Sequence, residues 1–373
     1  MRTRSTVLRT MGAPRPYAES RPLEVVELEL AGPRERELLV RVEAAGVCHS
    51  DLSVVDGSRP RPLPMALGHE AAGIVEEVGG GVTDVRVGDR VVLVFVPACG
   101  TCPECSSGSP ALCRNGARSN TAGELLGGGS RLSENGALVH HHLGVSAFSD
   151  RVVVDRGSAV VVPPEVPGDV AALFGCALLT GVGAVENTVT VRPGDAVAVF
   201  GLGGVGLAAV MGAHAAGAYP LIAVDPVPAK RELALELGAT HAVAPGPDAV
   251  TEIRDITGGG VRYAVEAVGH EQVLAEAFAA TARGGTTVAV GLPHPSKMLT
   301  LPAVTIVGEA RTLIGSYMGS AAPQRDVPRL VRSWQAGRLP VERLRSATLT
   351  LEEIPGAFDD LADGQAVRQL IVP

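Results

Sequence analysis

The sequence lacks an excess of positive charge, since its 373 residues include 32 Lys and Arg against 40 Asp and Glu, a formal net charge of -8. Because it also lacks a basic tract, we expect neither nucleic acid nor an anionic membrane as a main partner. No apolar run approaches the ~20 residues of a membrane span, and no apolar segment follows the basic amino terminus as in a secretory signal, so we expect a cytoplasmic protein. Hydrophobic residues make up 46% of the chain and charged residues 19%, which indicates a globular protein of two or three domains.

Cysteine is scarce as well, and its six residues fall into two groups. The first group has the spacing C-x2-C-x2-C-x7-C and consists of Cys99, Cys102, Cys105 and Cys113. In a chain without a secretory signal, this spacing favours a metal over disulfides. Four thiolates on one loop complete a tetrahedral shell around zinc and leave no position for a substrate, so we predict a structural zinc site. An iron–sulfur cluster and redox disulfides are the alternatives.

A glycine-rich turn lies between a short apolar run at 196–200 and an Ala-rich segment at 207–218. Its glycines follow the pattern G-x-G-x-x-G and are Gly201, Gly203 and Gly206. The pattern predicts a strand, a tight turn that a pyrophosphate can approach, and a helix whose amino terminus favours negative charge. Asp225 ends a second predicted strand about 20 residues further on, where a carboxylate can bind both hydroxyls of an adenosine ribose and repel a ribose phosphate. We therefore predict a site for NAD rather than NADP; the alternative is a turn that binds no ligand.

The segments on either side of this turn differ in pattern. Residues 22–96 contain alternating apolar stretches and Gly-rich turns, which predicts a β-rich barrel, whereas residues 114–137 are rich in Gly, Ser and Asn and are expected to pass over the surface. Farther along, predicted helices alternate with predicted strands; the helices are at 228–237 and 272–282, and the strands at 241–243, 263–267 and 286–290. Such alternation is typical of a doubly wound parallel sheet, so we predict an α/β fold.

Six motifs spread over nearly the whole chain occur in the order found in one protein family. They are GVCHSDL, GHEAAGIVEEVG, the four-cysteine loop, HHHLGVSAFSDRVVV, GCALLTGVGAV and VFGLGGVG. In these motifs the sequence resembles zinc-dependent alcohol dehydrogenases of the medium-chain dehydrogenase/reductase superfamily. It is most similar to the long-form members, which include thiol-dependent formaldehyde dehydrogenases, because residues 114–145 retain a long insertion. The resemblance implies a GroES-like catalytic domain at 1–177, completed by 320–373, a Rossmann NAD-binding domain at 178–319, and an active cleft between them.

The same resemblance implies a second zinc site and an activity. Cys48, His69 and Cys176 would bind the catalytic zinc, which makes two zinc ions per chain. The implied reaction is the reversible NAD-linked oxidation of an alcohol to an aldehyde or ketone, by hydride transfer from a zinc-bound alkoxide. One alternative is a thiol-dependent formaldehyde dehydrogenase that acts on an S-hydroxymethyl adduct, although Ala117 stands where glutathione-dependent members have an arginine. Another is a catalytically silent dinucleotide-binding protein.

The resemblance implies roles around this zinc for three residues of the family motifs. Ser50 would take the alcohol proton, unless its hydroxyl only caps the turn after Cys48. Asp51 would orient the imidazole of His69. Glu70 would tune the zinc without transferring a proton.

Contacts with the cofactor are implied at five more positions. Thr180 and Val205 would lie against the nicotinamide ring, and His49 and Arg368 would contact the pyrophosphate. Lys230, one of only two lysines, would contact the adenosine ribose. For His49, Lys230 and Arg368 the alternative is a solvated charge.

The substrate end departs from the family pattern. Arg59 and His142 replace a leucine and an aromatic residue of liver-type relatives, while an apolar wall would consist of Phe95, Leu143, Leu292 and Met318. These replacements suggest a substrate with a polar or anionic tail; the alternative is that Arg59 points to water. Ser53 stands where many long-form members have the histidine that completes a proton relay, so the usual exit for the proton is missing.

Residues 301–316, LPAVTIVGEARTLIGS, are strand-like and resemble the edge through which relatives extend their sheet across a two-fold axis. An uncovered apolar edge promotes pairing with a second chain. We therefore expect a homodimer, whose other partner is a small alcohol or aldehyde substrate.

Overall fold

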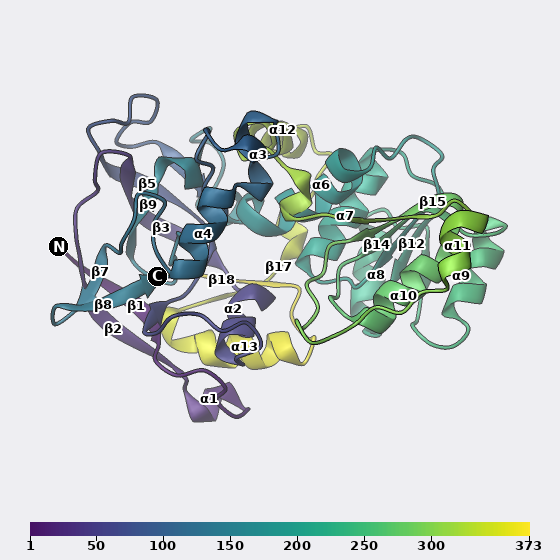
Figure 1. Cartoon of the computed structure of the whole chain (residues 1–373), viewed down its shortest axis with the longest axis horizontal. Helices are drawn as coiled ribbons and strands as arrows, with labels where there is room; N and C mark the ends of the chain where they lie inside the picture. Colours follow the sequence, from purple (N-terminus) through teal and green to yellow (C-terminus); the bar gives the residue numbers. More distant parts are fainter. The chain divides into compact units, whose positions relative to one another are not determined.

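The computed structural model describes residues 1–373, and the chain divides into two compact units (Figure 1). The first unit consists of Met1–Cys176, Ala322–Val331 and Arg345–Pro373, and the second of Ala177–Ala321 and Arg332–Leu344. This division differs from the predicted one, because residues 332–344 belong to the second unit. There the turn η6 (Val341–Leu344) has two buried apolar side chains and packs against helix α7 (Gly204–Ala215). Packing against a distant helix decides where this segment belongs, and the local sequence pattern does not reveal such a contact.

Two mainly antiparallel systems of strands form the first unit. A closed barrel has the strand order β1-β2-β7-β8-β4. Its strands are β1 (Arg2–Leu8), β2 (Leu23–Leu30), β4 (Met65–Ala66), β7 (Leu132–Glu134) and β8 (Ala137–His141). A seven-stranded sheet has the order β10-β6-β5-β3-β18-β17, with β9 also paired to β3. Its strands are β3 (Glu37–Gly46), β5 (Glu70–Val78), β6 (Arg90–Leu93), β9 (Arg151–Asp155), β10 (Ala159–Val162), β17 (Arg345–Leu349) and β18 (Arg368–Ile371).

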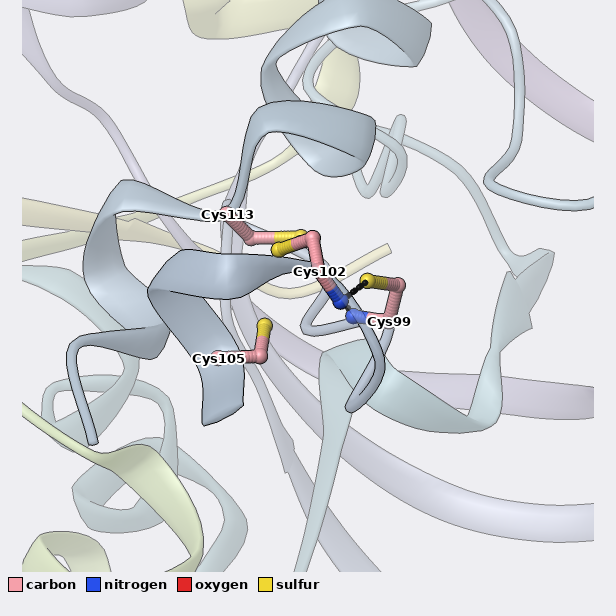
Figure 2. A group of neighbouring side chains, drawn as sticks. All are labelled: Cys99, Cys102, Cys105 and Cys113. Atoms are coloured by element: carbon pink, nitrogen blue, oxygen red, sulfur yellow. Dashed lines mark hydrogen bonds between the residues drawn. The ribbon is translucent and has the colours of Figure 1, made fainter. Parts of the chain in front are cut away.

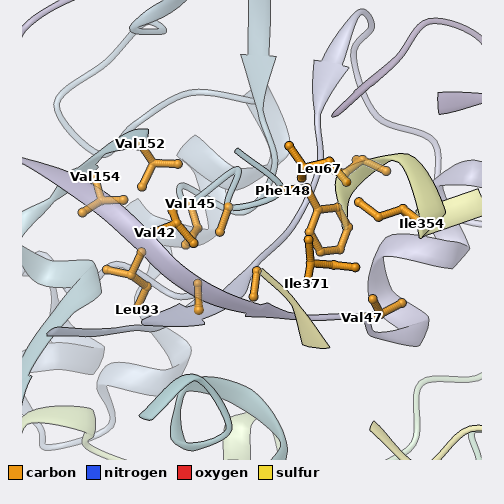
Figure 3. Close-up of a cluster of buried hydrophobic side chains, with 14 of the residues drawn as sticks. Val42, Val47, Leu67, Leu93, Val145, Phe148, Val152, Val154, Ile354 and Ile371 are labelled. Carbon is orange, nitrogen blue, oxygen red and sulfur yellow. The ribbon is translucent and has the colours of Figure 1, made fainter. Parts of the chain in front are cut away.

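Short helices connect these strands, and one apolar core holds them together. The helices are α1 (Tyr17–Ser20), α2 (His49–Val55), α3 (Pro103–Ser106), η1 (Pro110–Leu112), α4 (Arg114–Ala122), η2 (Arg156–Ser158), α5 (Gly168–Ala172), η7 (Leu351–Glu353) and α13 (Ile354–Ala362). Figure 3 shows part of the core, to which β3, β6, β9, α13 and β18 contribute Val42, Leu93, Val152, Ile354 and Ile371. The carboxyl-terminal segment therefore completes the core of the first unit. Two helical segments, η3 (Phe174–Leu178) and α12 (Pro323–Gln335), have residues in both units.

A parallel sheet of six strands forms the centre of the second unit, in the order β13-β12-β11-β14-β15-β16. The strands are β11 (Val197–Phe200), β12 (Leu221–Val224), β13 (His241–Val243), β14 (Val261–Glu266), β15 (Thr281–Ala289) and β16 (Thr312–Gly315). The remaining helices are α6 (Leu179–Gly183), η4 (Ala184–Thr188), α8 (Pro228–Glu236), α9 (Ala249–Thr257), α10 (Glu271–Ala280), α11 (Ala303–Gly308) and η5 (Met318–Ser320). Numbered within this unit, the strand order is 3-2-1-4-5-6, which is that of doubly wound dinucleotide-binding folds. Ligands of such folds bind at the carboxyl edge of the sheet where the strand order reverses, which is here between β11 and β14. The predicted α/β fold with a separate β-rich domain is thus confirmed.

Two segments differ from their predicted structure. Within 301–316 only β16 is a strand, since α11 begins directly after Pro302. A short run of β-branched residues suits either a helix or a strand, and its surroundings decide between them. Residues 114–137 do not simply pass over the surface, because they form α4 and β7 and bury Leu125 and Arg131.

The helical stretch Gly168–Thr188 is long and apolar enough, by length and composition alone, to cross a membrane. This stretch corrects the expectation that no apolar run approaches the length of a membrane span. In the folded chain, 89% of the most apolar window of this stretch is buried, as in the core helix of a globular protein.

Candidate metal centre and dinucleotide site

The four-cysteine loop brings its sulfur atoms together. The Sγ atoms of Cys99, Cys102, Cys105 and Cys113 all lie within 4.8 Å of one another, and Figure 2 shows the four side chains gathered at one place. The loop reaches this geometry through α3, η1 and the start of α4, where Cys113 precedes the helix and its Sγ accepts the N–H of Gly116 at 3.3 Å. Four sulfur donors at this spacing fit a tetrahedral zinc ion with no open position.

Neighbouring donors hold the sulfur of Cys99 in place. The N–H of Cys102 and the side-chain amide of Asn115 each donate to it at 3.3 Å. Although burial raises the pKa of Cys99, the N–H groups of Thr101 and Cys102 lower it to about 5. Such N–H···S bonds stabilise a thiolate and orient it, as a zinc ligand requires.

A second cluster joins residues that are far apart in the sequence. One ligand atom from each of Cys48, His69 and Cys176 lies within 4.8 Å of the others. Cys48 lies between β3 and α2, His69 directly precedes β5, and Cys176 lies in the π-helical turn η3. All three side chains are buried and belong to the first unit. The structure thus brings together the three residues assigned to the catalytic zinc.

Two glycines make this convergence possible. Gly68 precedes His69 and has a φ of +93°, and a Cβ atom at this position would lie 2.4 Å from the backbone nitrogen of Phe148. Gly175 precedes Cys176, and a Cβ atom there would lie 2.2 Å from the backbone oxygen of Leu93. Each backbone can approach its neighbour only without a side chain, so both glycines position the residue that follows them.

The donor chemistry of this cluster fits a cation. The Nε2 atom of His69 is buried and has no hydrogen-bond partner. Hydrogen bonding between the two thiols, which lie within 4.8 Å of each other, lowers the pKa of Cys48 well below its ordinary value and raises that of Cys176 well above it. A zinc ion would bind both sulfurs and the imidazole and keep a fourth position for a substrate.

Asp51 connects His69 to a second histidine. Its Oδ2 lies 3.0 Å from Nδ1 of His69, and its Oδ1 lies 3.0 Å from Nδ1 of His142. Burial by itself would raise the pKa of Asp51, but the two histidines lower it. Burial lowers the pKa of His69, while the charges of Asp51 and Cys48 raise it further, so that it lies well above its ordinary value. Asp51 thus lies at the Nδ1 side of His69, the place at which the resemblance implies a carboxylate that orients this imidazole.

His142, which is predicted at the substrate end, lies next to Asp51 and His69. It is 1% exposed, its Nδ1 faces Asp51, and its ring meets that of His69 edge-on at 5.6 Å between centroids. Burial lowers the pKa of His142 against the attraction of Asp51.

The aromatic ring of Phe95 lies against the imidazole of His69. Its ring meets that of His69 edge-on, with 5.6 Å between centroids. The side-chain amide of Asn120, on α4, donates to the backbone oxygen of Phe95 at 2.7 Å. Phe95 is therefore held next to the predicted zinc ligand, where its apolar ring can exclude water.

Glu70 and Arg368 form a buried ion pair. Oε2 of Glu70 lies 3.0 Å from Nη1 of Arg368, and the two side chains are 0% and 4% exposed. A Cβ atom at Gly46 would lie 2.8 Å from the Glu70 carboxyl group, so this glycine makes room for the pair. Arg368 also donates to the backbone oxygen of Val47 at 3.0 Å. The structure thus shows Arg368 engaged with Glu70, whereas the resemblance assigns it to the pyrophosphate.

The glycine turn follows β11 at the reversal of the strand order. Gly201 has a φ of +88°, and a Cβ atom at Gly206 would lie 1.7 Å from the backbone oxygen of Gly201, so α7 packs directly on the turn. A Cβ atom at Gly203 would meet nothing within 4 Å. Gly203 is also the residue that precedes α7. Open backbone at the start of a helix of this length is suited to an anionic pyrophosphate.

Asp225 and Lys230 lie together after β12. The Asp225 carboxylate accepts the N–H of Leu202 at 2.8 Å and that of Val227 at 2.9 Å. Each carboxylate oxygen has a further lone pair that a ribose hydroxyl can use. Burial lowers the pKa of Lys230, and the charge of Asp225 raises it in part.

The residues assigned to the nicotinamide also gather within the second unit. A Cβ atom at Gly181 would lie 2.2 Å from the backbone oxygen of Val205, so α6 touches α7 at that point. Thr180 on α6 is 9% exposed, and its hydroxyl oxygen has no hydrogen-bond partner. Met318 is buried and lies in η5, which packs on α6 through Gly319. An unpartnered buried hydroxyl on Thr180, the residue before Gly181, fits a contact with a cofactor.

Two family models match the chain: an alcohol dehydrogenase GroES-like domain over residues 34–164 and a zinc-binding dehydrogenase over residues 204–335. The NDMA-dependent alcohol dehydrogenase of Amycolatopsis methanolica is 40% identical over 376 residues, which cover 100% of this chain and 99% of that protein. The chain belongs to the zinc-dependent alcohol dehydrogenase family. It is therefore an oxidoreductase of the alcohol dehydrogenase class, and the resemblance predicted from its motifs is confirmed.

Two further members of the alcohol dehydrogenase family show the breadth of the match. An S-(hydroxymethyl)glutathione dehydrogenase of a Synechocystis species is 38% identical over 361 residues, which cover 95% of this chain and 97% of that protein. The crystal structure of benzyl alcohol dehydrogenase from Acinetobacter calcoaceticus has a TM-score of 0.92 and 33% identity, with coverage of 100% and 99%. These similarities extend over both units and do not distinguish among substrates.

Several positions that the alcohol dehydrogenase motifs single out lie on α2 or just after it. His49 is exposed and Ser50 half-buried at the start of the helix. The hydroxyl of Ser53 donates to the backbone oxygen of Ser50 at 2.8 Å, so it caps the helix from within. Arg59 is half-buried in the loop that follows.

The remaining residues are those predicted to line the substrate end of the site. Leu143 is buried with a φ of +50° in the first unit, whereas Leu292 is 53% exposed in the second. One residue that sequence reasoning missed is Arg61, whose charge adds to the effect of burial in lowering the pKa of His142. Arg61 belongs to the same RPRP segment as Arg59, and only the folded loop distinguishes which arginine acts on His142.

Proposed function

We propose that this protein catalyses the reversible NAD-linked oxidation of an alcohol to an aldehyde or ketone. The observation that carries this proposal is the buried cluster of Cys48, His69 and Cys176, whose ligand atoms lie within 4.8 Å of one another. Zinc at this cluster would supply Lewis-acid polarisation of the substrate oxygen. The second unit supplies the dinucleotide site, in which the glycine turn takes the pyrophosphate and Asp225 the adenosine ribose.

The residues around the cluster have separate tasks. Asp51 keeps the proton of His69 on Nδ1, which leaves the Nε2 lone pair for the metal. Ser50, two residues after Cys48, accepts the proton of the alcohol. Phe95 and Leu143 form an apolar wall that excludes water from the reacting carbon.

The assay that tests this function follows NADH formation by zinc-loaded protein with aliphatic, aromatic and acid-tailed alcohols. Cys48→Ser, which removes one zinc ligand and keeps a hydroxyl of similar size, is the matched control. Turnover of free alcohols that is lost in Cys48→Ser supports the proposal. No turnover of any alcohol by protein that contains two zinc ions per chain would refute it. Parallel reactions with NDMA as acceptor test whether this chain shares the dependence named for the Amycolatopsis relative.

Asp225 is the basis for proposing NAD rather than NADP. Its carboxylate would lie beside any 2′-phosphate of the ribose, and like charges in contact repel. We expect Asp225→Gly to raise kcat/KM with NADP relative to NAD by on the order of tenfold, which corresponds to about 1.4 kcal/mol. Asp248→Asn, which removes an exposed acid of the same unit, is the control. An unchanged NADP to NAD ratio in Asp225→Gly would show that Asp225 does not select the cofactor.

A second candidate is a thiol-dependent formaldehyde dehydrogenase. The 38% identity to an S-(hydroxymethyl)glutathione dehydrogenase and the long segment 114–145 favour it. The same assay with formaldehyde, alone and with glutathione or mycothiol, distinguishes the two candidates. Activity that appears only when formaldehyde and a thiol are combined would favour the second candidate over the first.

The same chain is proposed to act as a homodimer. β16 is the edge strand of the parallel sheet, and nearby α11 exposes Val304 at 77% and Val307 at 85%. Apolar side chains at a sheet edge are covered when a second copy adds its own edge.

A further inference from the structure

Two buried imidazoles share one buried carboxylate in the first unit. Asp51 is 0% exposed, and His69 and His142 are each 1% exposed. The two imidazole Nδ1 atoms both lie 3.0 Å from the Asp51 carboxylate, His69 at Oδ2 and His142 at Oδ1. The N–H of Gly68 also donates to Oδ1 at 3.0 Å. Polar groups thus approach both oxygens of the carboxylate from two parts of the fold, the Gly68–His69 segment and His142.

This arrangement determines the orientation of His69. A carboxylate with donors on one oxygen only can turn about its Cβ–Cγ bond, whereas donors on both oxygens fix its plane. His69 can bind a metal through Nε2 only if its own proton stays on Nδ1, directed at Oδ2. Anything that fixes the plane of Asp51 therefore fixes the direction of the Nε2 lone pair.

His142 also contacts His69 directly. The two rings meet edge-on, at 5.6 Å between centroids and an interplanar angle of 88°. The contact of His142 with Asp51 joins two segments that are 91 positions apart in the sequence, because His142 follows β8 and Asp51 lies on α2. An apolar ring could fill the same space, so the position of Nδ1 of His142 at 3.0 Å from a buried carboxylate indicates an electrostatic contact rather than packing alone.

We propose that His142 is a positioning residue for the zinc ligand His69, and that it acts through Asp51. This inference rests on the proposed zinc site, because it concerns how firmly that site holds its metal. It gives His142 a role that the resemblance, which places this residue at the substrate end, does not.

The test compares two replacements of His142. His142→Phe keeps an aromatic ring and removes the donor, whereas His142→Asn restores an N–H near the place of Nδ1. For each variant we would measure zinc per chain, the rate of zinc loss to a chelator, and the visible spectrum of the protein with Co²⁺ in the catalytic site. His140→Gln, on the neighbouring strand β8, controls for the loss of a histidine.

We expect His142→Phe to lose one of its two zinc ions roughly tenfold or more faster than the wild type, because groups that contact a metal ligand typically strengthen metal binding by that much. The same variant should also shift the visible spectrum of the Co²⁺ protein. His142→Asn should lose zinc within about threefold of the wild-type rate. Equal zinc retention in His142→Phe and the wild type would overturn the proposal, and so would equal losses in the Phe and Asn variants. If His142→Phe does not fold, His142→Met offers the same test without a donor.

These outcomes are separable from a failure of the proposed function. Wild-type protein that binds two zinc ions but oxidises no alcohol would refute the function and leave the metal measurements valid. Protein that oxidises alcohols while His142→Phe keeps its zinc would refute the inference alone.

Discussion

At the scale of single residues, the first unit buries several charged or titratable side chains, and each is matched to a partner. Arg131 and Glu37 form a bidentate pair with Nε to Oε2 at 2.8 Å and Nη2 to Oε1 at 2.5 Å, and both are almost fully buried. Removing one member of such a pair typically costs about 3–5 kcal/mol, because the other charge stays buried. The same segment buries His141, whose Nε2 accepts the backbone N–H of Arg131 at 3.2 Å.

The burial of His141 affects how the stability of the protein depends on pH. Burial, together with the charge of Arg131, lowers its pKa from 6.5 to about 3. Between these values the unfolded chain binds a proton that the folded chain does not, so the free energy of unfolding falls as the pH falls. The slope from this one group is at most about 1.4 kcal/mol per pH unit.

We expect His141→Gln, whose side-chain oxygen can still accept the Arg131 N–H, to reduce that slope between pH 6 and pH 4 by up to about 1.4 kcal/mol per pH unit. Urea unfolding at a series of pH values measures it. His294→Gln removes an exposed histidine and serves as the control. Identical slopes in wild type and His141→Gln would show that burial of His141 does not contribute to acid unfolding.

At the scale of elements, helix α4 connects the two metal sites of the first unit. Near its start, Asn115 donates to the sulfur of Cys99, and near its end Asn120 donates to the backbone of Phe95, whose ring lies against His69. A helix is stiff over a few turns, so the order of the four-cysteine loop affects where Phe95 lies. The loop is thus part of the support of the catalytic cluster.

Loss of the structural zinc should therefore destabilise the first unit. We expect Cys105→Ser to reduce the zinc content from two ions per chain to one and to lower Tm by roughly 5–10 °C, because metal binding contributes directly to folding. Elemental analysis and calorimetry measure both, with Ser106→Ala on the same loop as control. Two zinc ions per chain in Cys105→Ser would contradict a site built from four thiolates.

At the scale of the whole molecule, exposed apolar side chains concentrate near the edge of the parallel sheet. Met298 is 80% and Val307 85% exposed, and β16 leaves its Leu313 and Ile314 side chains 39% and 37% exposed. Apolar patches at a strand edge are typical of interfaces between identical chains. The proposed dimer would bury them.

We expect the wild-type protein to sediment as a dimer of 38.2 kDa chains and Val307→Lys to shift it toward the monomer. A charge at the centre of an apolar interface would lose its hydration on association. Val87→Lys, at an exposed position of the first unit, is the control. Wild-type protein that remains monomeric at micromolar concentration would contradict the dimer.

The features that could be predicted from the sequence are those set by short spacings along the chain. Three glycines within six residues determine a turn of one shape, because only glycine tolerates its positive φ and its contact with the following helix. Four cysteines within fifteen residues can reach one metal at a small entropic cost of closing the loop. The alternation of strands and helices after residue 196 likewise reports a parallel sheet, since each crossover needs its own helix.

The tertiary structure alone decided what depends on contacts between distant segments. Cys48, His69 and Cys176 meet only after β3, β5 and η3 have packed, and spacing by itself said nothing of that convergence. Packing also turned 303–308 into a helix, assigned 332–344 to the second unit and placed His142 on Asp51. The physical reason is the same in each case: local backbone preferences differ by less than the free energy of burying apolar surface or pairing a buried charge, so the long-range contact determines the outcome.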